Sequence, residues 1–90
     1  MKKNEVKEKM YLVMKKAIAN KNKVKIKYKS VNSGITERII HPAELFIYLD
    51  KWYIAAFCEL RNEIRLFKLD DIIEYEILAE KYIDKNTIKK

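Results

Sequence analysis

Arg65 is the residue whose type and setting best suit the binding of an anion. It stands between Ile64 and Leu66 in an otherwise apolar segment. An arginine in such surroundings needs a partner, because a buried and unpaired charge is costly. Its planar guanidinium can hold a phosphate through two parallel hydrogen bonds. The partner is therefore either a ligand or one of three internal carboxylates, those of Glu44, Glu63 and Asp70.

Aromatic and hydroxyl side chains can complete such a site. Trp52 and Tyr53 are neighbours in a predicted strand and point to opposite faces, so at most one can stack against a base, a contact worth about 1–3 kcal/mol. Both rings can equally belong to the core. Tyr28 and Ser30 share a parity at a strand end, where two hydroxyls can face a pocket. Alternatively, Tyr28 packs in the core with its hydroxyl at the rim.

The chain contains few of the residues that catalysis or metal binding requires. The chain has one histidine, one cysteine, two serines and one glycine, too few for a nucleophilic triad, a zinc site or a phosphate-cradling loop. Adjacent Asp70 and Asp71 suit a turn better than a magnesium site. His41 can bind phosphate when protonated, but before Pro42 it also suits a structural role, and Cys58 suits a small core position. We expect no enzyme, no metal and no cofactor.

The positive charge of the chain is concentrated near its start. The net charge is +7, yet residues 1–29 hold eleven lysines and two acids, or +9, and the remainder carries −2. Such a field attracts anions within a Debye length of about 8–10 Å. A single-stranded nucleic acid or nucleotide-like ligand is therefore the first partner to consider. The steering lysines are Lys23, Lys25, Lys27 and Lys29, and the supporting cations are Arg38, Arg61 and Lys68; the alternative for each is a solvated surface charge.

The elements that position these residues follow from periodicity. An apolar stripe at helical spacing predicts a helix from Asn4 to about Asn20 that lies on another element. The pattern then alternates over 23–29, which predicts a strand with Tyr28 on its apolar face. A longer strand is predicted over 35–49, with a bend or bulge at Pro42 because proline cannot donate to the ladder. Six of its residues share one parity: Ile35, Ile39, His41, Ala43, Leu45 and Ile47.

The rest of the chain predicts three more strands. Asp50-Lys51 is a candidate hairpin turn, and the segment from Trp52 to Cys58 is apolar on both parities. That pattern predicts a strand covered on both faces, by the interior of the sheet and by the helix or a partner. Two further strands are expected over 64–69 and 74–80. One helix and five strands joined by short turns form a meander, which curls and closes in part to avoid exposed edges.

We therefore expect a mainly β fold with one N-terminal helix and a strongly bent, five-stranded antiparallel, partly open barrel. Ninety residues make a single domain, divided into an amphipathic helix over 1–22, a barrel over 23–80 and a frayed basic tail over 81–90. The lone cysteine favours a reducing, cytoplasmic setting, and no apolar run is long enough to span a membrane.

From about Ala17 to Tyr82 the chain resembles the WYL domain family. The Trp-Tyr-Leu triplet that names the family is here Trp52-Tyr53-Ile54. The order and spacing of the flanking segments also match. These segments are Ala17-Ile18, Tyr28-Lys29-Ser30, Arg38 ahead of His41-Pro42, and Arg65-Leu66-Phe67-Lys68-Leu69-Asp70 ahead of Ile72.

The resemblance implies an SH3-like or Sm-like barrel, found mostly in bacterial transcription regulators, that binds nucleic-acid strands or nucleotide-like ligands in a basic, aromatic-lined pocket. It favours a ligand contact for Arg65. Asp71 stands where the family usually has an arginine, so an anion replaces an expected cation and the identity of the ligand is open. Relatives commonly carry a helix-turn-helix and a C-terminal extension, and we expect neither here.

The expected function is a stand-alone, non-enzymatic sensor in transcriptional or nucleic-acid-linked regulation. Its anionic ligand would bind in a pocket framed by Arg65, Tyr28, Ser30 and one of Trp52 and Tyr53. The alternative is a protein-interaction or oligomerisation module, paired with a second copy or with a regulator protein, because a partner surface can supply the cover that the third strand lacks.

Overall fold

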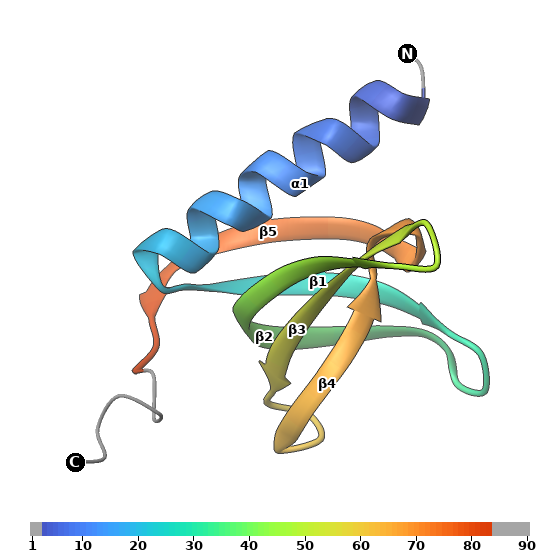
Figure 1. The fold of residues 1–90 in the computed structure, drawn as a ribbon. Coiled ribbons are helices and arrows are strands. Elements are labelled where there is room, and N and C mark those ends of the chain that lie inside the picture. Colours follow the sequence, from blue (N-terminus) through green and yellow to red (C-terminus); the bar gives the residue numbers. More distant parts are fainter. Residues whose placement is uncertain (1–2, 84–90) are drawn as a thin grey trace.

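The computed structural model describes the backbone of residues 3–83 and the side chains from Lys9 onward. The elements in chain order are α1 (Lys3–Asn20), β1 (Asn22–Ser30), β2 (Gly34–Tyr48), β3 (Lys51–Cys58), β4 (Glu63–Lys68), a 3-10 turn η1 (Leu69–Asp71) and β5 (Ile72–Lys81). Figure 1 shows α1 lying across a strongly curved sheet. The predicted helix and five strands are confirmed.

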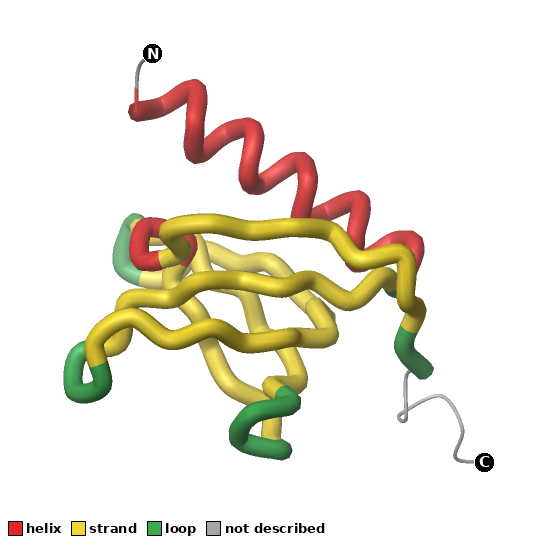
Figure 2. Tube along the Cα trace, turned by 180° about the vertical axis from the view of Figure 1, so that it is seen from behind, coloured by secondary structure: helices red, strands yellow, loops and turns green. Residues whose placement is uncertain are grey.

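The five strands form one antiparallel sheet in the order β4-β3-β2-β1-β5. The sheet is strongly bent and is not closed into a complete barrel, as expected (Figure 2). The simple meander is wrong in one respect, because β5 pairs with β1 and not with β4. The short turn η1 carries the chain from one edge of the curled sheet to the other.

A β-bulge in β2 decides which side chains point inward. The pairing of β2 with β3 shifts register between Pro42 and Glu44, which confirms the irregularity predicted at the proline. Before the bulge Ile40 and Pro42 are buried, and after it the inward position passes to Leu45, opposite the buried Ile54. A bulge adds one residue to a strand and so reverses its inside–outside alternation. The residues of one parity over 35–47 therefore do not all lie on the same face of the sheet.

The β2–β3 turn lies one residue earlier than predicted. Leu49 and Asp50 form it with φ values of 51° and 63°, while Lys51 already belongs to β3. Two positive φ values in succession match the twist of a tight hairpin. The sequence signal is weak here because leucine rarely adopts a positive φ.

The core lies between α1 and the inner, concave face of the sheet. Met10, Met14 and Ala17 are the buried residues of the helix. They pack with apolar side chains from all parts of the sheet: Val24, Ile26, Ile40, Ile54, Ala56, Cys58, Phe67, Leu69 and Ile72. The helix is thus held by its apolar stripe, as short amphipathic helices generally are.

The outer face of β3 is only half-covered. Ile54, Ala56 and Cys58 are buried on the inner face, whereas Tyr53 and Phe57 on the outer face are half-buried. Of the two predicted covers for the second face of β3, the helix is wrong, because α1 packs on the inner face, and a partner stays a prediction.

The predicted tail over 81–90 is described only as far as Ile83. Lys81 is the last residue of β5. Tyr82 donates its backbone N–H to the carbonyl of Lys21 at 3.0 Å and its hydroxyl proton to the carbonyl of Pro42. Residues 84–90 lie outside the described residues. Within the described part of the chain, no helix combines the length and apolar character that crossing a membrane requires.

Substitution of the buried helix residue Met14 by alanine is expected to destabilise the whole fold. Met14 is fully buried, and truncating a core methionine costs about 2–5 kcal/mol. The control is Leu12→Ala, since Leu12 is 56% exposed on the same helix. Urea unfolding followed by circular dichroism measures both. Equal unfolding free energies for the two variants would contradict the packing of α1 described above.

Candidate functional site

Arg38 is the most deeply buried charged residue among those described, with 5% of its surface exposed. It lies on β2 opposite Ile26, so its side chain points to the inner face. All three nitrogens of the guanidinium donate hydrogen bonds. The acceptors are Thr36 Oγ1 at 3.0 Å from Nε, Ser30 Oγ at 3.3 Å from Nη2 and Cys58 Sγ at 3.7 Å from Nη1.

Two aromatic rings form the wall beside this guanidinium. The Cζ atom of Arg38 lies 5.7 Å from the centre of the Phe67 ring, within the range of a cation–π contact. Tyr28 meets Phe67 edge-on, with ring centres 5.0 Å apart. The Tyr28 hydroxyl accepts the backbone N–H of Lys68 at 3.1 Å, which joins β1 to the end of β4 across the open side of the barrel.

Among the described residues, no carboxylate forms a hydrogen bond or ion pair with Arg38. Its hydrogen-bond partners are all neutral, and none of the ion pairs among the described residues includes it. These bonds use three of the five N–H donors of the guanidinium, and its positive charge is paired with no carboxylate among the described residues. Ser30 and Thr36, on the side of Nη2 and Nε, are half-buried. An anion that reaches this side would meet an uncompensated cation in surroundings of low polarity.

Sequence reasoning ranked Arg38 only as a supporting cation and missed Thr36. The sequence does contain a signal that Arg38 faces inward. Arg38 has the same parity as Ile40 and Pro42, which are buried. Thr36 lies opposite Tyr28 in the same ladder and therefore faces inward too.

Arg65, the residue ranked first, is held by its own chain. Its Nη1 donates to Glu63 Oε2 at 2.7 Å, and its side chain is 41% exposed. Of the three internal carboxylates considered, Glu63 is therefore the partner. Arg65 lies opposite Ala56, on the inner side of β4, two residues before Phe67. Its Nε and Nη2 donors are not used in that ion pair.

The structure places Trp52 and Tyr53 away from Arg38. Trp52 packs against the core, with its ring 4.6 Å from that of Tyr11 on α1. It lies six positions before Cys58 on β3, or about 20 Å along an extended strand. Tyr53 lies on the outer face, where its ring is 5.7 Å from that of Phe46. Both rings are half-buried.

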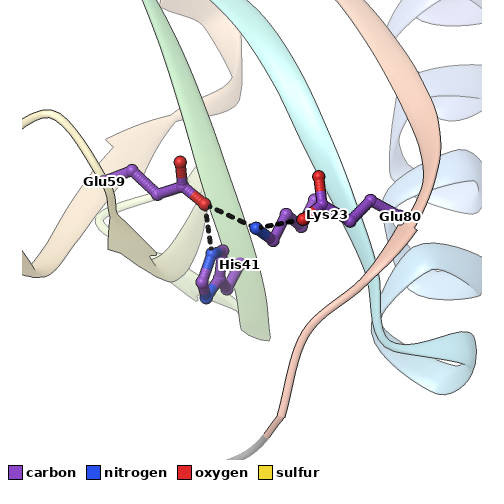
Figure 3. Close-up of polar contacts among 4 residues, drawn as sticks. All are labelled: Lys23, His41, Glu59 and Glu80. Carbon is purple, nitrogen blue, oxygen red and sulfur yellow. Dashed lines mark hydrogen bonds and ion pairs between the residues drawn. The ribbon is translucent and has the colours of Figure 1, made fainter.

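His41 belongs to a separate polar network that joins three strands and a loop (Figure 3). Its Nε2 donates to Glu59 Oε2 at 2.8 Å. The Lys23 ammonium contacts Glu59 and Glu80, each at 2.9 Å. The imidazole also stacks on Tyr82, with ring centres 4.9 Å apart. This network fastens the end of β5 to β1 and β2.

The hydrogen bonds of this network shift two pKa values. The bond from His41 and then that from Lys23 hold the pKa of Glu59 below its usual 4.5. The bonds to Glu59 and Glu80 raise the pKa of Lys23 above 10.5. Each shift favours the charged form, as expected for paired groups.

The remaining predicted cations are dispersed. Lys27 forms an ion pair with Glu74 at 3.6 Å, and Lys25 lies opposite Glu76 on β5, so acids on β5 offset part of the lysine row of β1. Lys29 and Arg61 are exposed, and Lys68 is half-buried. The described residues contain no group of three histidine, cysteine or acidic side chains that could hold a metal ion.

A hollow of about 320 Å³ adjoins the site. Its lining residues are Lys25, Glu37, Arg38, Ile39, Glu59 and Leu60. Two carboxylates and two cations line it, so the hollow offers an anion no surplus of positive charge. We therefore place the candidate anion site on the side of Arg38 formed by Ser30 and Thr36.

Comparisons with known proteins bear on this arrangement. The family model described as WYL domain matches residues 9–77. Among solved structures, the proteasome accessory factor B/C (PafBC) of Arthrobacter aurescens is similar, with a TM-score of 0.81 and 22% identity. That match covers 93% of this chain and only 13% of the other, so it concerns the fold of one module within a much longer protein. No curated protein sequence matches.

The network around Glu59 is expected to make stability depend on pH. Because its pKa is lowered, Glu59 contributes stability above its usual 4.5, and this contribution is lost as the pH falls through the lowered value in the folded state. The variant Glu59→Gln should therefore be less stable than the parent near pH 7, and the difference should shrink below pH 4.5. Thermal unfolding at several pH values measures this.

A matched control is Glu37→Gln. Glu37 is exposed and takes part in none of the ion pairs found among the described residues. A pH-independent difference for Glu59→Gln, or an equal effect of Glu37→Gln, would contradict the role given to this network.

Proposed function

This chain belongs to the WYL domain family, whose model matches residues 9–77, and we propose that it is a non-enzymatic sensor that binds a phosphate-bearing anion beside Arg38. The ligand is a single-stranded nucleic acid or a nucleotide-derived signal. The family and the similar fold support a regulatory ligand-sensing domain in general. The nature of the ligand and the place where it binds are our proposal.

One observation carries this proposal, the buried guanidinium of Arg38 with only neutral partners. A buried charge lowers the stability of a fold unless a counter-charge is near. A phosphate oxygen would supply that counter-charge and make charge-assisted hydrogen bonds, which are about twice as strong as neutral ones. An anion is therefore the chemistry that this site recognises best.

Other side chains support the same ligand class. Ser30 and Thr36 offer hydroxyls next to the guanidinium, and Arg65 lies on the same side of the sheet with donors to spare. The surplus of +9 in residues 1–29 raises the local concentration of anions. We leave Trp52 and Tyr53 out of this site, because neither contacts Arg38.

Arg38→Gln is expected to weaken binding at least tenfold. Charge-assisted hydrogen bonds contribute about 1.5–3 kcal/mol, or roughly 10- to 150-fold in affinity. Fluorescence anisotropy with a labelled twelve-residue single-stranded oligonucleotide, in competition with free nucleotides, measures the affinity. The control Lys9→Gln removes one exposed cation from α1 and should leave the affinity within about twofold.

Circular dichroism shows whether Arg38→Gln is folded. If it is folded and binds as tightly as the parent, the proposed site is wrong. An equal loss for Arg38→Gln and Lys9→Gln would indicate nonspecific attraction by total charge and would also overturn the site.

Glu63→Gln tests the contribution of Arg65 without disturbing the core. Glu63 and Arg65 are both exposed, so removing the carboxylate frees the guanidinium and takes away a negative charge. Affinity for the oligonucleotide should rise by about threefold, in line with the small energies of exposed ion pairs. Glu76→Gln on β5 makes the same charge change far along the sheet. An equal gain for both variants would exclude Arg65 from the site.

A further inference from the structure

The free edge of β4 is the least protected part of the described sheet. In the order β4-β3-β2-β1-β5, strand β4 is paired on one side only. Its first four residues, Glu63–Leu66, are exposed on both faces. Figure 1 shows this half of β4 running apart from β1 and β5 at the front of the barrel. A strand in this position offers unpaired backbone groups to another chain.

The backbone groups at this edge belong to Ile64 and Leu66. The N–H of Lys68 is donated to the Tyr28 hydroxyl, away from β3. The direction of the backbone N–H and C=O groups alternates along a strand. Those of Ile64 and Leu66 therefore point to the same side, where no described strand pairs with these four groups.

Strand β5, at the other edge of the sheet, has features that discourage pairing with another chain. On β5 the exposed residues include Glu74, Glu76 and Glu80, and its pairing with β1 contains register shifts. Charges and bulges of this kind discourage edge-to-edge pairing. In contrast, β4 pairs with β3 without any shift, contains no proline, and has only aliphatic side chains on the outward side of Glu63–Leu66.

The outward side chains of β4 extend an apolar surface. Ile64 and Leu66 are 62% and 57% exposed, and they lie opposite Phe57 and Ala55 of β3. The stacked rings of Phe46 and Tyr53 continue it across the sheet. This is the outer face that α1 leaves uncovered.

We propose that a second copy of this chain binds at this edge by antiparallel β4–β4 pairing around a two-fold axis. In the register that we infer, Ile64 lies opposite Leu66 of the partner subunit, and Arg65 lies opposite Arg65 of the partner subunit at the axis. The two five-stranded sheets then become one ten-stranded sheet. Four aliphatic side chains meet on its outer face.

The charges at the edge favour a second copy over a different protein. Glu63 and Arg65 form an ion pair within each chain, so Glu63–Leu66 carries no net charge in either copy. The surplus positive charge of the molecule lies in residues 1–29, in α1 and in β1, which is three positions away from β4 in the sheet. A two-fold axis also makes the same short strand complementary to itself.

Sedimentation velocity on the whole chain over a concentration series up to about 1 mM tests the proposal, because small interfaces are weak. We expect a reversible shift towards twice the monomer mass of 10.8 kDa. Ile64→Lys places a charge on the edge and should abolish the shift. The control Ile73→Lys changes an exposed isoleucine of β5 and should preserve it. A parent chain that stays monomeric, or an Ile64→Lys variant that still dimerises, overturns the proposal.

A cross-linking experiment tests the register independently of affinity. On a Cys58→Ala background, Arg65→Cys places two thiols at the axis, within the Cα separation of about 4.4–6.8 Å that a disulfide needs. Mild oxidation should give a covalent dimer. Glu74→Cys on β5 is the control and should stay monomeric. Cross-linking at Glu74 but not at Arg65, or at neither, contradicts β4–β4 pairing. Neither experiment depends on the anion site.

Discussion

The burial of one guanidinium without a counter-charge is the constraint on which the interior of this protein depends. Arg38 keeps its hydrogen bonds through Ser30, Thr36 and Cys58, which come from β1, β2 and β3. These three acceptors meet because adjacent strands place them near Arg38: Thr36 lies two residues before it on β2, and Cys58 lies opposite Ile40. The hydrogen bonds offset much of the cost of removing the donors from water, whereas the net charge stays. The register of β1, β2 and β3 thus holds a positive charge at the edge of a small apolar core.

The helix and the strands could largely be predicted from the sequence, whereas the pairing of the strands with one another could not. Alternation over 23–29 and helical spacing over 4–20 are local properties, so both elements follow from residue types. The position of β5 beside β1 depends on how strongly the sheet curls between β4 and β1. Alternation of apolar and polar residues does not predict that curvature. The irregularity at Pro42 is predictable from the proline, whereas the reversal of the inward-facing parity depends on the exact position of the extra residue.

The ranking of the two arginines shows why a site is harder to predict than a fold. Arg65 has apolar neighbours on both sides, and those neighbours turn out to be exposed at a free edge. Glu63, two residues earlier on the same face, is near enough to pair with it. Arg38 has the charged neighbour Glu37 and looks like a surface residue, but period-two alternation sends it inward. Apolar neighbours in sequence therefore do not establish burial in space.

Strand β4 joins the two surfaces that we propose to be functional. Phe67, near its end, packs against the guanidinium of Arg38, while Ile64 and Leu66, near its start, form the free edge. An anion beside Arg38 would act on the same six-residue strand that a second copy would extend. If dimerisation raises the affinity for the anion by some factor, thermodynamic linkage requires that the anion raises the affinity of dimerisation by the same factor. A short strand that contacts the anion site through Phe67 and has an unpaired edge at Ile64 and Leu66 is a direct physical route for such coupling.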